Sequence, residues 1–226
     1  ADDALRAEAR RGAGLAYRGL GRMEEALATF DATIAALDAP DGTRQDALWD
    51  RATTHMILEN FREAVVDYST ALVYADAHGL ESAAIRVNRG VAYARVGDAD
   101  RARVDYEAVL HRDDAPPVQL RKARLNRADL ALRAGDLEGA ADDCLAIAAD
   151  PAQRGTPEYA QATKALAYCL VVSGRPLEAI RWLGSHPAAA ERDEEIRTLA
   201  TALRTGADPS ASQALLDLVL SLPNSN

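Results

Sequence analysis

Cysteines, histidines and paired aspartates are the residues of this sequence that could take part in chemistry. Four histidines are scattered along the chain, and none of them, His55 included, stands in a catalytic arrangement. Asp113-Asp114 and Asp142-Asp143 have no converging metal ligands beside them, so a loop and a solvated helix face explain them better. Cys144 and Cys169 lie at apolar helical positions, which predicts buried free thiols rather than a disulfide. We therefore expect no metal and no cofactor.

The short motifs of catalysis and nucleotide binding are missing from the sequence. Gly12 and Gly14 form a glycine pair, but Tyr17 stands where a dinucleotide-binding loop needs its third glycine. The motifs of P-loops, zinc proteases, serine hydrolases and thiol redox sites are also absent. These observations favour a protein that binds over one that catalyses, and we expect it not to be an enzyme.

Basic and amide side chains gather on particular stretches. Residues 82–97 contain three arginines and no acid, and residues 118–134 contain five basic residues against the single acid Asp129. Asn88 and Asn126 lie 38 residues apart within these stretches, and a side-chain amide can both donate to and accept from a peptide bond. The alternative interpretation is that the charges form solvated faces and ion pairs inside one hairpin, each of small energetic value.

A repeat reveals the elements that must position these residues. Small residues recur at steps of 38, 38, 38 and 39: Gly14, Ala52, Gly90, Ala128 and Ala167. Twelve residues later a second small series has the same period: Ala26, Ala64, Ala102, Ala140 and Ala179. A third, mostly bulky series runs in phase with both: Phe30, Tyr68, Tyr106, Cys144 and Leu183. Self-similarity at this period indicates a solenoid in which each unit stacks on its neighbours.

Residues 82–112 show one repeat most clearly. An amphipathic helix stops at Gly97, and Asp98 then caps a second helix that starts at Ala99. Two antiparallel helices joined by a short turn form a hairpin, and the chain predicts twelve helices in six of them. We expect one domain over residues 1–226, with repeats at about 3–38, 43–77, 80–113, 118–151, 156–187 and 189–222.

The segments 13–37 and 88–110 resemble tetratricopeptide repeats. Both have a small residue followed by tyrosine in the first helix, and alanine followed by an aromatic residue in the second. The resemblance covers nearly the whole chain and implies an all-α, right-handed superhelical solenoid. Two features depart from the family: Arg51, Arg89 and Arg127 directly precede the small residue, and the period is about four residues longer than the usual 34.

The resemblance also implies a function. First helices of the family line a concave groove, so we expect a protein–protein interaction scaffold that binds a peptide segment, of acidic character, in this groove. The expected peptide-binding residues are Trp49, Asn88, Arg95, Lys122, Asn126, Arg133, Lys164 and Tyr168. Two alternatives stay open: a regulatory or sensor part of a larger signalling or transcription protein, and binding of single-stranded RNA by the basic stretches. The RNA alternative needs stacking aromatics, and only 5% of the residues are aromatic.

Composition and the chain ends complete the expectations. The net charge of -9 disfavours general binding to nucleic acid or to a membrane, and the lack of a targeting or spanning segment predicts a cytoplasmic protein. The sequence begins at Ala1 in helical sequence, which leaves an excised fragment and a processed form as alternatives. Near the other end, Leu216 and Leu220 lie outside the main apolar stripe of residues 211–222. Three interpretations stay open: the protein continues past Asn226, these leucines form a homodimer contact, or the preceding helix partly covers them.

Overall fold

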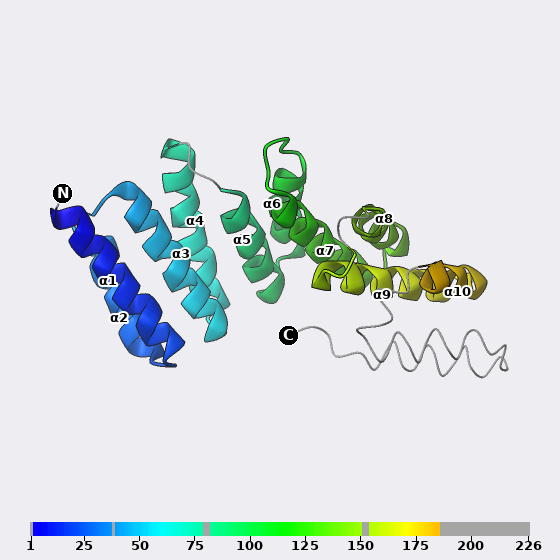
Figure 1. Ribbon diagram of the computed structural model, residues 1–226, viewed down its shortest axis with the longest axis horizontal. Helices are drawn as coiled ribbons and strands as arrows, with labels where there is room; N and C mark the ends of the chain where they lie inside the picture. The colour runs from blue at the N-terminus through cyan, green and yellow to red at the C-terminus, as the bar shows by residue number, and fades with distance from the viewer. Residues whose placement is uncertain (1, 38, 79–81, 151–153, 186–226) are drawn as a thin grey trace. The chain divides into compact units, whose positions relative to one another are not determined.

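The computed structural model describes residues 2–37, 39–78, 82–150 and 154–185. Every regular element in these ranges is an α-helix, and the helices follow one another as antiparallel pairs (Figure 1). The all-helical architecture built from helical hairpins is therefore confirmed. The sixth expected hairpin, at 189–222, and its leucines Leu216 and Leu220 lie outside the described residues, so the expected homodimer contact stays a prediction.

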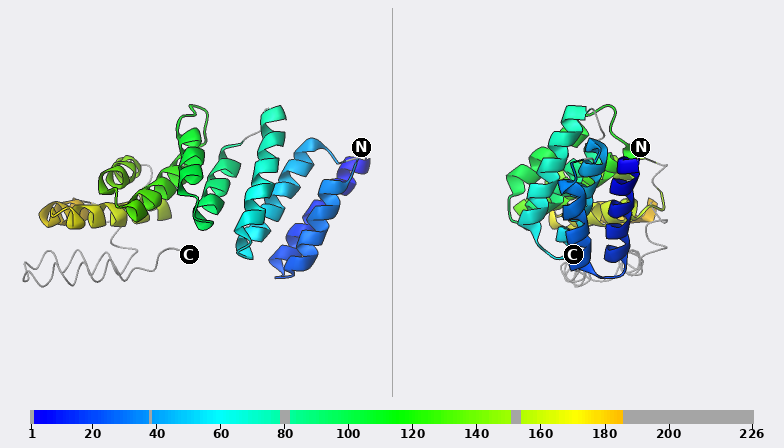
Figure 2. Two further views of the ribbon diagram at one scale, coloured as in Figure 1. Left: turned by 180° about the vertical axis from the view of Figure 1, so that it is seen from behind. Right: turned by 90° about the vertical axis from the view of Figure 1, so that its left-hand side faces the viewer.

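The chain divides into two compact units, Ala1–Leu120 and Arg121–Asn226. Unit 1 contains three hairpins: α1 (Asp2–Gly19) with α2 (Met23–Ala35), α3 (Asp41–Ile57) with α4 (Phe61–His78), and α5 (Ala83–Arg95) with α6 (Ala99–Leu110). Helix α2 also packs on α3, and α4 packs on α5. The three hairpins of unit 1 are thus stacked in chain order (Figure 2).

Unit 2 holds most of α7 (Pro117–Ala134), with α8 (Leu137–Ala148), α9 (Pro157–Val172) and α10 (Pro176–Ser185). Helix α9 packs against both α8 and α10. Cys144 and Cys169 belong to the hydrophobic core that these helices share, and both are buried free thiols, as the sequence predicted. Burial raises the pKa of Cys144 to about 12 and that of Cys169 to about 11. A single solenoid over residues 1–226 stays a prediction.

The turns inside the hairpins share one backbone conformation. Gly21, Gly97, Gly135 and Gly174 have φ between 74 and 86°, a left-handed region that glycine enters without steric cost. In the second hairpin Glu59 takes this place, with φ of 60°. Where Asp98 and Asp136 follow the glycine, their carboxylates accept a hydrogen bond from a backbone N–H of the next helix, at 3.1 and 2.9 Å.

The series of small residues marks the closest approach of the two helices of a hairpin. A Cβ added to Gly14 would lie 2.5 Å from the Phe30 ring, and one added to Gly90 would likewise collide with the Tyr106 ring. Across from these positions, Ala26 and Ala102 are completely buried. A large side chain at either position would force the helices apart, so the spacing of the small series sets the geometry of each hairpin.

Candidate functional site

Three arginines of the first helices form two-pronged ion pairs with aspartates of the second helices. Arg51 donates to both carboxylate oxygens of Asp67 at 2.6 and 2.8 Å. Arg89 binds Asp105 at 2.7 Å through each of two nitrogens, and Arg127 binds Asp143 at 2.8 Å in the same manner (hereafter the Arg–Asp pairs). All three aspartates are buried. A planar guanidinium that meets a buried carboxylate in this way fixes the distance between the two helices.

In unit 1 the same arginines also reach the preceding hairpin. Arg51 donates to Asp31 on α2, and Arg89 donates to Ser69 on α4 at 3.2 Å. The hydrogen bond to Asp67 raises the pKa of Arg51 above its ordinary value, although burial acts against this. Each of these arginines therefore holds its own hairpin together and links it to the previous one.

The Arg–Asp pairs change the interpretation of the basic stretches. Arg89 and Arg127, which contribute to the charge of 82–97 and 118–134, are directed at the second helix and are matched by an acid there. Arg133 forms an ion pair with Asp129 on its own helix at 2.8 Å. Much of the positive charge counted along the first helices is thus balanced within the hairpins, which is the alternative that the sequence left open.

A polar network crosses the first helices of unit 1. Arg11 on α1 donates to Asp50 on α3 at 2.7 Å and lies 3.1 Å from Asp46. Arg18 donates to the backbone oxygen of Asp50 at 3.1 Å. Burial, the largest single influence, lowers the pKa of Arg11, but the hydrogen bond to Asp50 and the negative charges of Asp50, Asp46 and Glu8 together outweigh it, so the net shift is upward. Burial is also the main reason why the pKa of Asp46 is raised.

The network continues to α5 through Tyr68. The Tyr68 hydroxyl lies 3.2 Å from the Thr53 hydroxyl on α3, and it also interacts with the side chain of Asn88 on α5. Burial raises the pKa of Tyr68, while hydrogen bonds to Thr53 and Asn88 act in the opposite direction. Trp49 is half-buried against the hydrophobic core formed by α3, α4 and α5. Asn88, predicted from the sequence, is therefore part of this network, and Trp49, also predicted, packs against the core that α3, α4 and α5 form.

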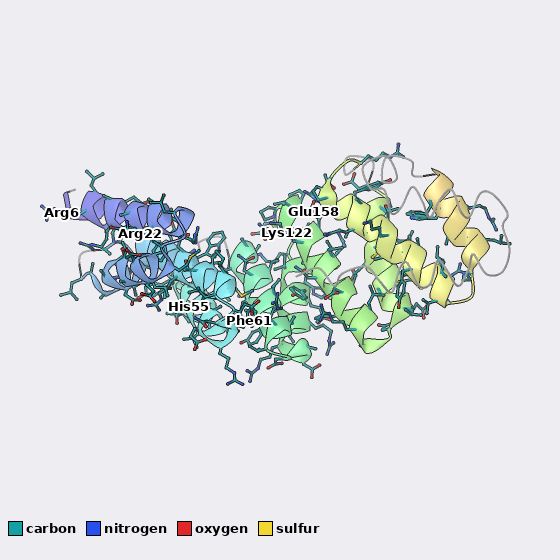
Figure 3. All side chains as sticks on the ribbon, turned by 90° about the horizontal axis from the view of Figure 1, so that it is seen from below. Arg6, Arg22, His55, Phe61, Lys122 and Glu158 are labelled. Atoms are coloured by element: carbon teal, nitrogen blue, oxygen red, sulfur yellow. The ribbon has the colours of Figure 1, made fainter. Side chains whose placement is uncertain are left out.

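Arg95 is the third predicted residue of unit 1, and it contacts the preceding hairpin. Its guanidinium lies over the ring of Phe61, 4.4 Å from the centroid, and 3.7 Å from the Glu59 carboxylate (Phe61 is labelled in Figure 3). The Arg95 side chain is only about one third exposed (36%). Arg95 thus helps to join α5 to the start of α4.

In unit 2 the predicted residues lie on α7 and α9. Lys122, labelled in Figure 3, is exposed on α7, and Asn126 is half-buried one turn further along. Lys122 and Arg124 form no ion pair or hydrogen bond among the described residues, so this end of α7 keeps net positive charge. On α9, Lys164 is half-buried, and Tyr168 packs against the core that contains Cys144.

Sequence reasoning missed the acidic members of both networks. Asp67, Asp105 and Asp143 also recur every 38 residues, each directly before the bulky series and 16 residues after its arginine. That double spacing could have identified the Arg–Asp pairs. The partners of Asp50 follow no such repeat, and only the packing of α1 beside α3 brings them together.

Comparison with known proteins identifies the repeat. The tetratricopeptide repeat family model matches residues 87–154, which include the segment 88–110. Residues 87–154 contain tetratricopeptide repeats. A search of curated proteins gave no match.

Solved structures show the same fold at low sequence identity. BtubC from P. vanneervenii has a TM-score of 0.65 at 16% identity, over 87% of this chain and 80% of that one. A protein of nearly identical TPR-like repeats from P. anserina has a TM-score of 0.62 at 18% identity, over 83% and 95%. A tetratricopeptide repeat protein from Parabacteroides merdae has a TM-score of 0.59 at 17% identity, over 96% and 85%. At these identities the likeness establishes the architecture alone.

The described residues were also considered as a membrane span and as a metal site. None of the described helices combines the length and the apolar character needed to cross a bilayer. Histidine, cysteine, aspartate and glutamate side chains form no group of three that could hold a metal ion in the described part of the chain.

Proposed function

We propose that this protein is a non-catalytic interaction scaffold whose first helices bind an extended, acidic peptide segment of a partner protein. The tetratricopeptide repeats and the similar solved structures support an interaction scaffold in general. In unit 1 the proposal assigns peptide contacts to Trp49, Asn88 and Arg95. In unit 2 it assigns them to Lys122, Asn126, Arg133, Lys164 and Tyr168.

One observation carries the acidic preference: Lys122 and Arg124 keep their charge on α7, while two arginines further along the helix are balanced. Arg127 is taken by Asp143, and Arg133 by Asp129. Arg127 is held by a buried aspartate and gains little from a second carboxylate, and Arg133 would share its charge with the exposed Asp129, whereas Lys122 and Arg124 lose no partner on binding. Asn126, one turn from Lys122, can bond to the peptide backbone on either its donor or its acceptor side.

The surface of unit 1 supplies a different kind of contact. Trp49 offers a partly exposed aromatic face, and Asn88 offers an amide that already interacts with the Tyr68 hydroxyl. An aromatic anchor beside oriented polar groups is typical of the residues that dominate binding energy at protein interfaces. We expect Trp49→Ala to weaken binding by about tenfold or more, because hot-spot truncations commonly cost at least 1–2 kcal/mol.

The test is a selection of phage-displayed random peptides on the full immobilised chain, followed by fluorescence anisotropy with a selected peptide. We expect enrichment of acidic peptides, weaker binding at higher salt, and about a tenfold loss for Lys122→Glu/Arg124→Glu. The control is Arg62→Glu/Arg101→Glu, which changes the net charge equally on exposed positions of the second helices α4 and α6. Equal losses in the two variants would contradict the assignment to first helices.

A second arm replaces the peptides with a labelled single-stranded RNA of mixed sequence. Tight binding of RNA that Lys122→Glu/Arg124→Glu abolishes, with no enrichment of acidic peptides, would reject the peptide proposal in favour of the nucleic-acid alternative. Circular dichroism of each variant checks that the helices are intact before affinities are compared.

A further inference from the structure

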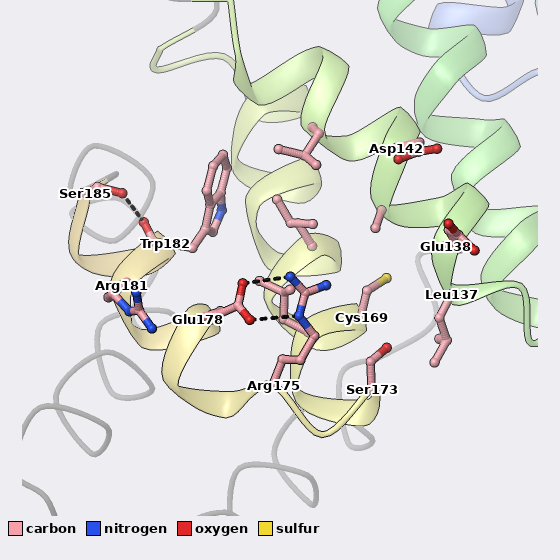
Figure 4. A pocket seen from close by; sticks show the side chains of 14 residues that line it. Leu137, Glu138, Asp142, Cys169, Ser173, Arg175, Glu178, Arg181, Trp182 and Ser185 are labelled. Atoms are coloured by element: carbon pink, nitrogen blue, oxygen red, sulfur yellow. Dashed lines mark hydrogen bonds and ion pairs between the residues drawn. The ribbon is translucent and has the colours of Figure 1, made fainter.

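A cavity of about 660 Å³ opens between the second helices α8 and α10 of unit 2 (Figure 4). Leu166, Cys169 and Leu170 of α9 contribute to its lining, together with Trp182 of α10. Of these, Leu166 and Cys169 are buried in the core shared by α7, α8 and α9. The cavity therefore has an apolar floor that is part of the stable interior of unit 2.

This cavity is separate from the proposed peptide-binding residues. Successive residues of an α-helix are about 100° apart, so Lys164 and Tyr168 lie on one side of α9 while Leu166 and Leu170 lie on the other. None of the eight expected peptide-binding residues contributes to the lining. A ligand in this cavity would leave the first-helix surface of unit 2 free.

The two edges of the cavity carry different charge. Glu138 and Asp142 are exposed one turn apart on α8, and neither forms an ion pair or hydrogen bond within the described part of the chain. On the α10 edge, Glu178 is held by Arg175 at 2.7 Å. Arg175, with a smaller contribution from Arg181, lowers the pKa of Glu178. The α8 edge is thus acidic and unmatched, while the α10 edge has a surplus of positive charge.

We propose that this groove binds an amphipathic helical segment of another protein, with its apolar stripe on the α9 floor and lysine or arginine residues beside Glu138 and Asp142. A hydrophobic groove between two helices is a common receptor for the apolar face of a third. The volume lies within the range of about 300–1,000 Å³ that is usual for ligand clefts, so the groove accepts inserted side chains rather than a whole helix. Leu145, which is 41% exposed, extends the apolar surface along α8.

Charge complementarity argues for a basic partner rather than for residues 211–222 of this chain. Residues 211–222 contain the most apolar stripe after α10, but their only charged residue is Asp217. That segment would leave Glu138 and Asp142 without a cation and would bring a third carboxylate near them. A partner helix with lysine or arginine along one flank matches the acidic α8 edge. Its opposite flank can carry acids that match Arg181 on the α10 edge.

The experiment uses two synthetic helical peptides labelled with fluorescein. Both have the same leucine stripe, and the flank is lysine in one and glutamate in the other. Fluorescence anisotropy against the full chain measures the affinity of each. We expect the lysine peptide to bind at least about tenfold more tightly than the glutamate peptide, and added salt to reduce the difference.

Variants of the acidic edge then locate the contact. Glu138→Lys/Asp142→Lys should weaken the lysine peptide by about tenfold and strengthen the glutamate peptide, because attraction is replaced by repulsion. The matched control is Asp100→Lys/Asp113→Lys, which makes the same change in net charge at exposed positions of unit 1. This control should keep the affinity for the lysine peptide within about twofold, since neither residue lines the groove.

Leu145→Ser tests the apolar part of the groove without disturbing the core, because this side chain is partly exposed in the folded protein. It should weaken both peptides and leave the circular dichroism spectrum unchanged. The proposal is overturned if neither peptide binds, if both bind equally, or if the unit 1 control loses as much affinity as the groove variant.

Discussion

Replacing Arg89 with alanine should be among the most damaging single changes on the surface of the first helices. The Asp105 carboxylate is only 2% exposed, and both of its oxygens accept hydrogen bonds from Arg89 at 2.7 Å. In the Arg89→Ala variant this carboxylate stays buried without a cation. Removing one partner of a buried ion pair costs about 3–5 kcal/mol of unfolding free energy. The Arg89 side chain is itself 18% exposed, which favours the lower end, about 3 kcal/mol.

A second Arg–Asp pair and one surface pair provide an internal scale for this loss. Arg127 is 32% exposed and Asp143 is 7% exposed, so water can reach the orphaned carboxylate more easily, and Arg127→Ala should cost about 2 kcal/mol. Arg133 and Asp129 are 57% and 54% exposed, and Arg133→Ala should change stability by no more than about 0.5 kcal/mol. The expected order of destabilisation is Arg89, then Arg127, then Arg133.

Thermal unfolding followed by circular dichroism measures this order. For a chain of this size about 1 kcal/mol corresponds to 2–4 °C in Tm, so Arg89→Ala should lower Tm by roughly 6–12 °C. The reasoning is refuted if Arg89→Ala melts within 2 °C of Arg133→Ala. The double variant Arg89→Leu/Asp105→Leu separates charge from packing. Since it removes both charges, it should regain most of the loss, and a double variant as unstable as Arg89→Ala would show that packing by the arginine stem is responsible.

Three further outcomes follow from local geometry. Glu59→Gly should raise the free energy of unfolding by about 1 kcal/mol in a denaturant titration. Glu59 has a φ of 60°, and this left-handed conformation costs any residue except glycine about that much. Gly90→Ala should lower the free energy of unfolding by about 1–3 kcal/mol, because the new methyl group collides with Tyr106. The added change Tyr106→Cys, which copies the fourth repeat, should recover part of this loss. A Gly90→Ala variant as stable as the wild type contradicts the close contact. Cys144 and Cys169 should react with a thiol reagent only after denaturation. Burial raises their pKa above the ordinary 9.0, so the folded state keeps protons that the unfolded state loses, and stability should fall as pH rises above about 9.

The sequence was sufficient for the hairpins because their determinants are local and periodic. Gly97 with Asp98 sets the end of α5 and the cap of α6, and the structure shows the left-handed turn and the capping hydrogen bond that this pair predicts. Gly90 and Ala102 recur with the period of the repeat, and both lie at the close contact between helices. These features depend on a few neighbouring residues, so the pattern contains them without knowledge of the tertiary structure.

The charged surface could not be predicted in this way, because a count of charges along a helix ignores the side on which each charge lies. Lys122 and Arg127 are five residues apart, which places them about 140° from one another around α7. Arg127 therefore reaches Asp143 on α8, whereas Lys122 stays exposed.

The useful quantity is the charge that remains after each cation is assigned to the acid it faces. By that measure the first helix of the fourth repeat keeps a small basic patch at Arg121, Lys122 and Arg124, and the acids left over on its second helix are Glu138 and Asp142. An interaction scaffold with these two unmatched patches on different helices of one unit can hold an acidic and a basic segment at the same time, and simultaneous binding of one peptide of each kind is the outcome that the two proposals together require.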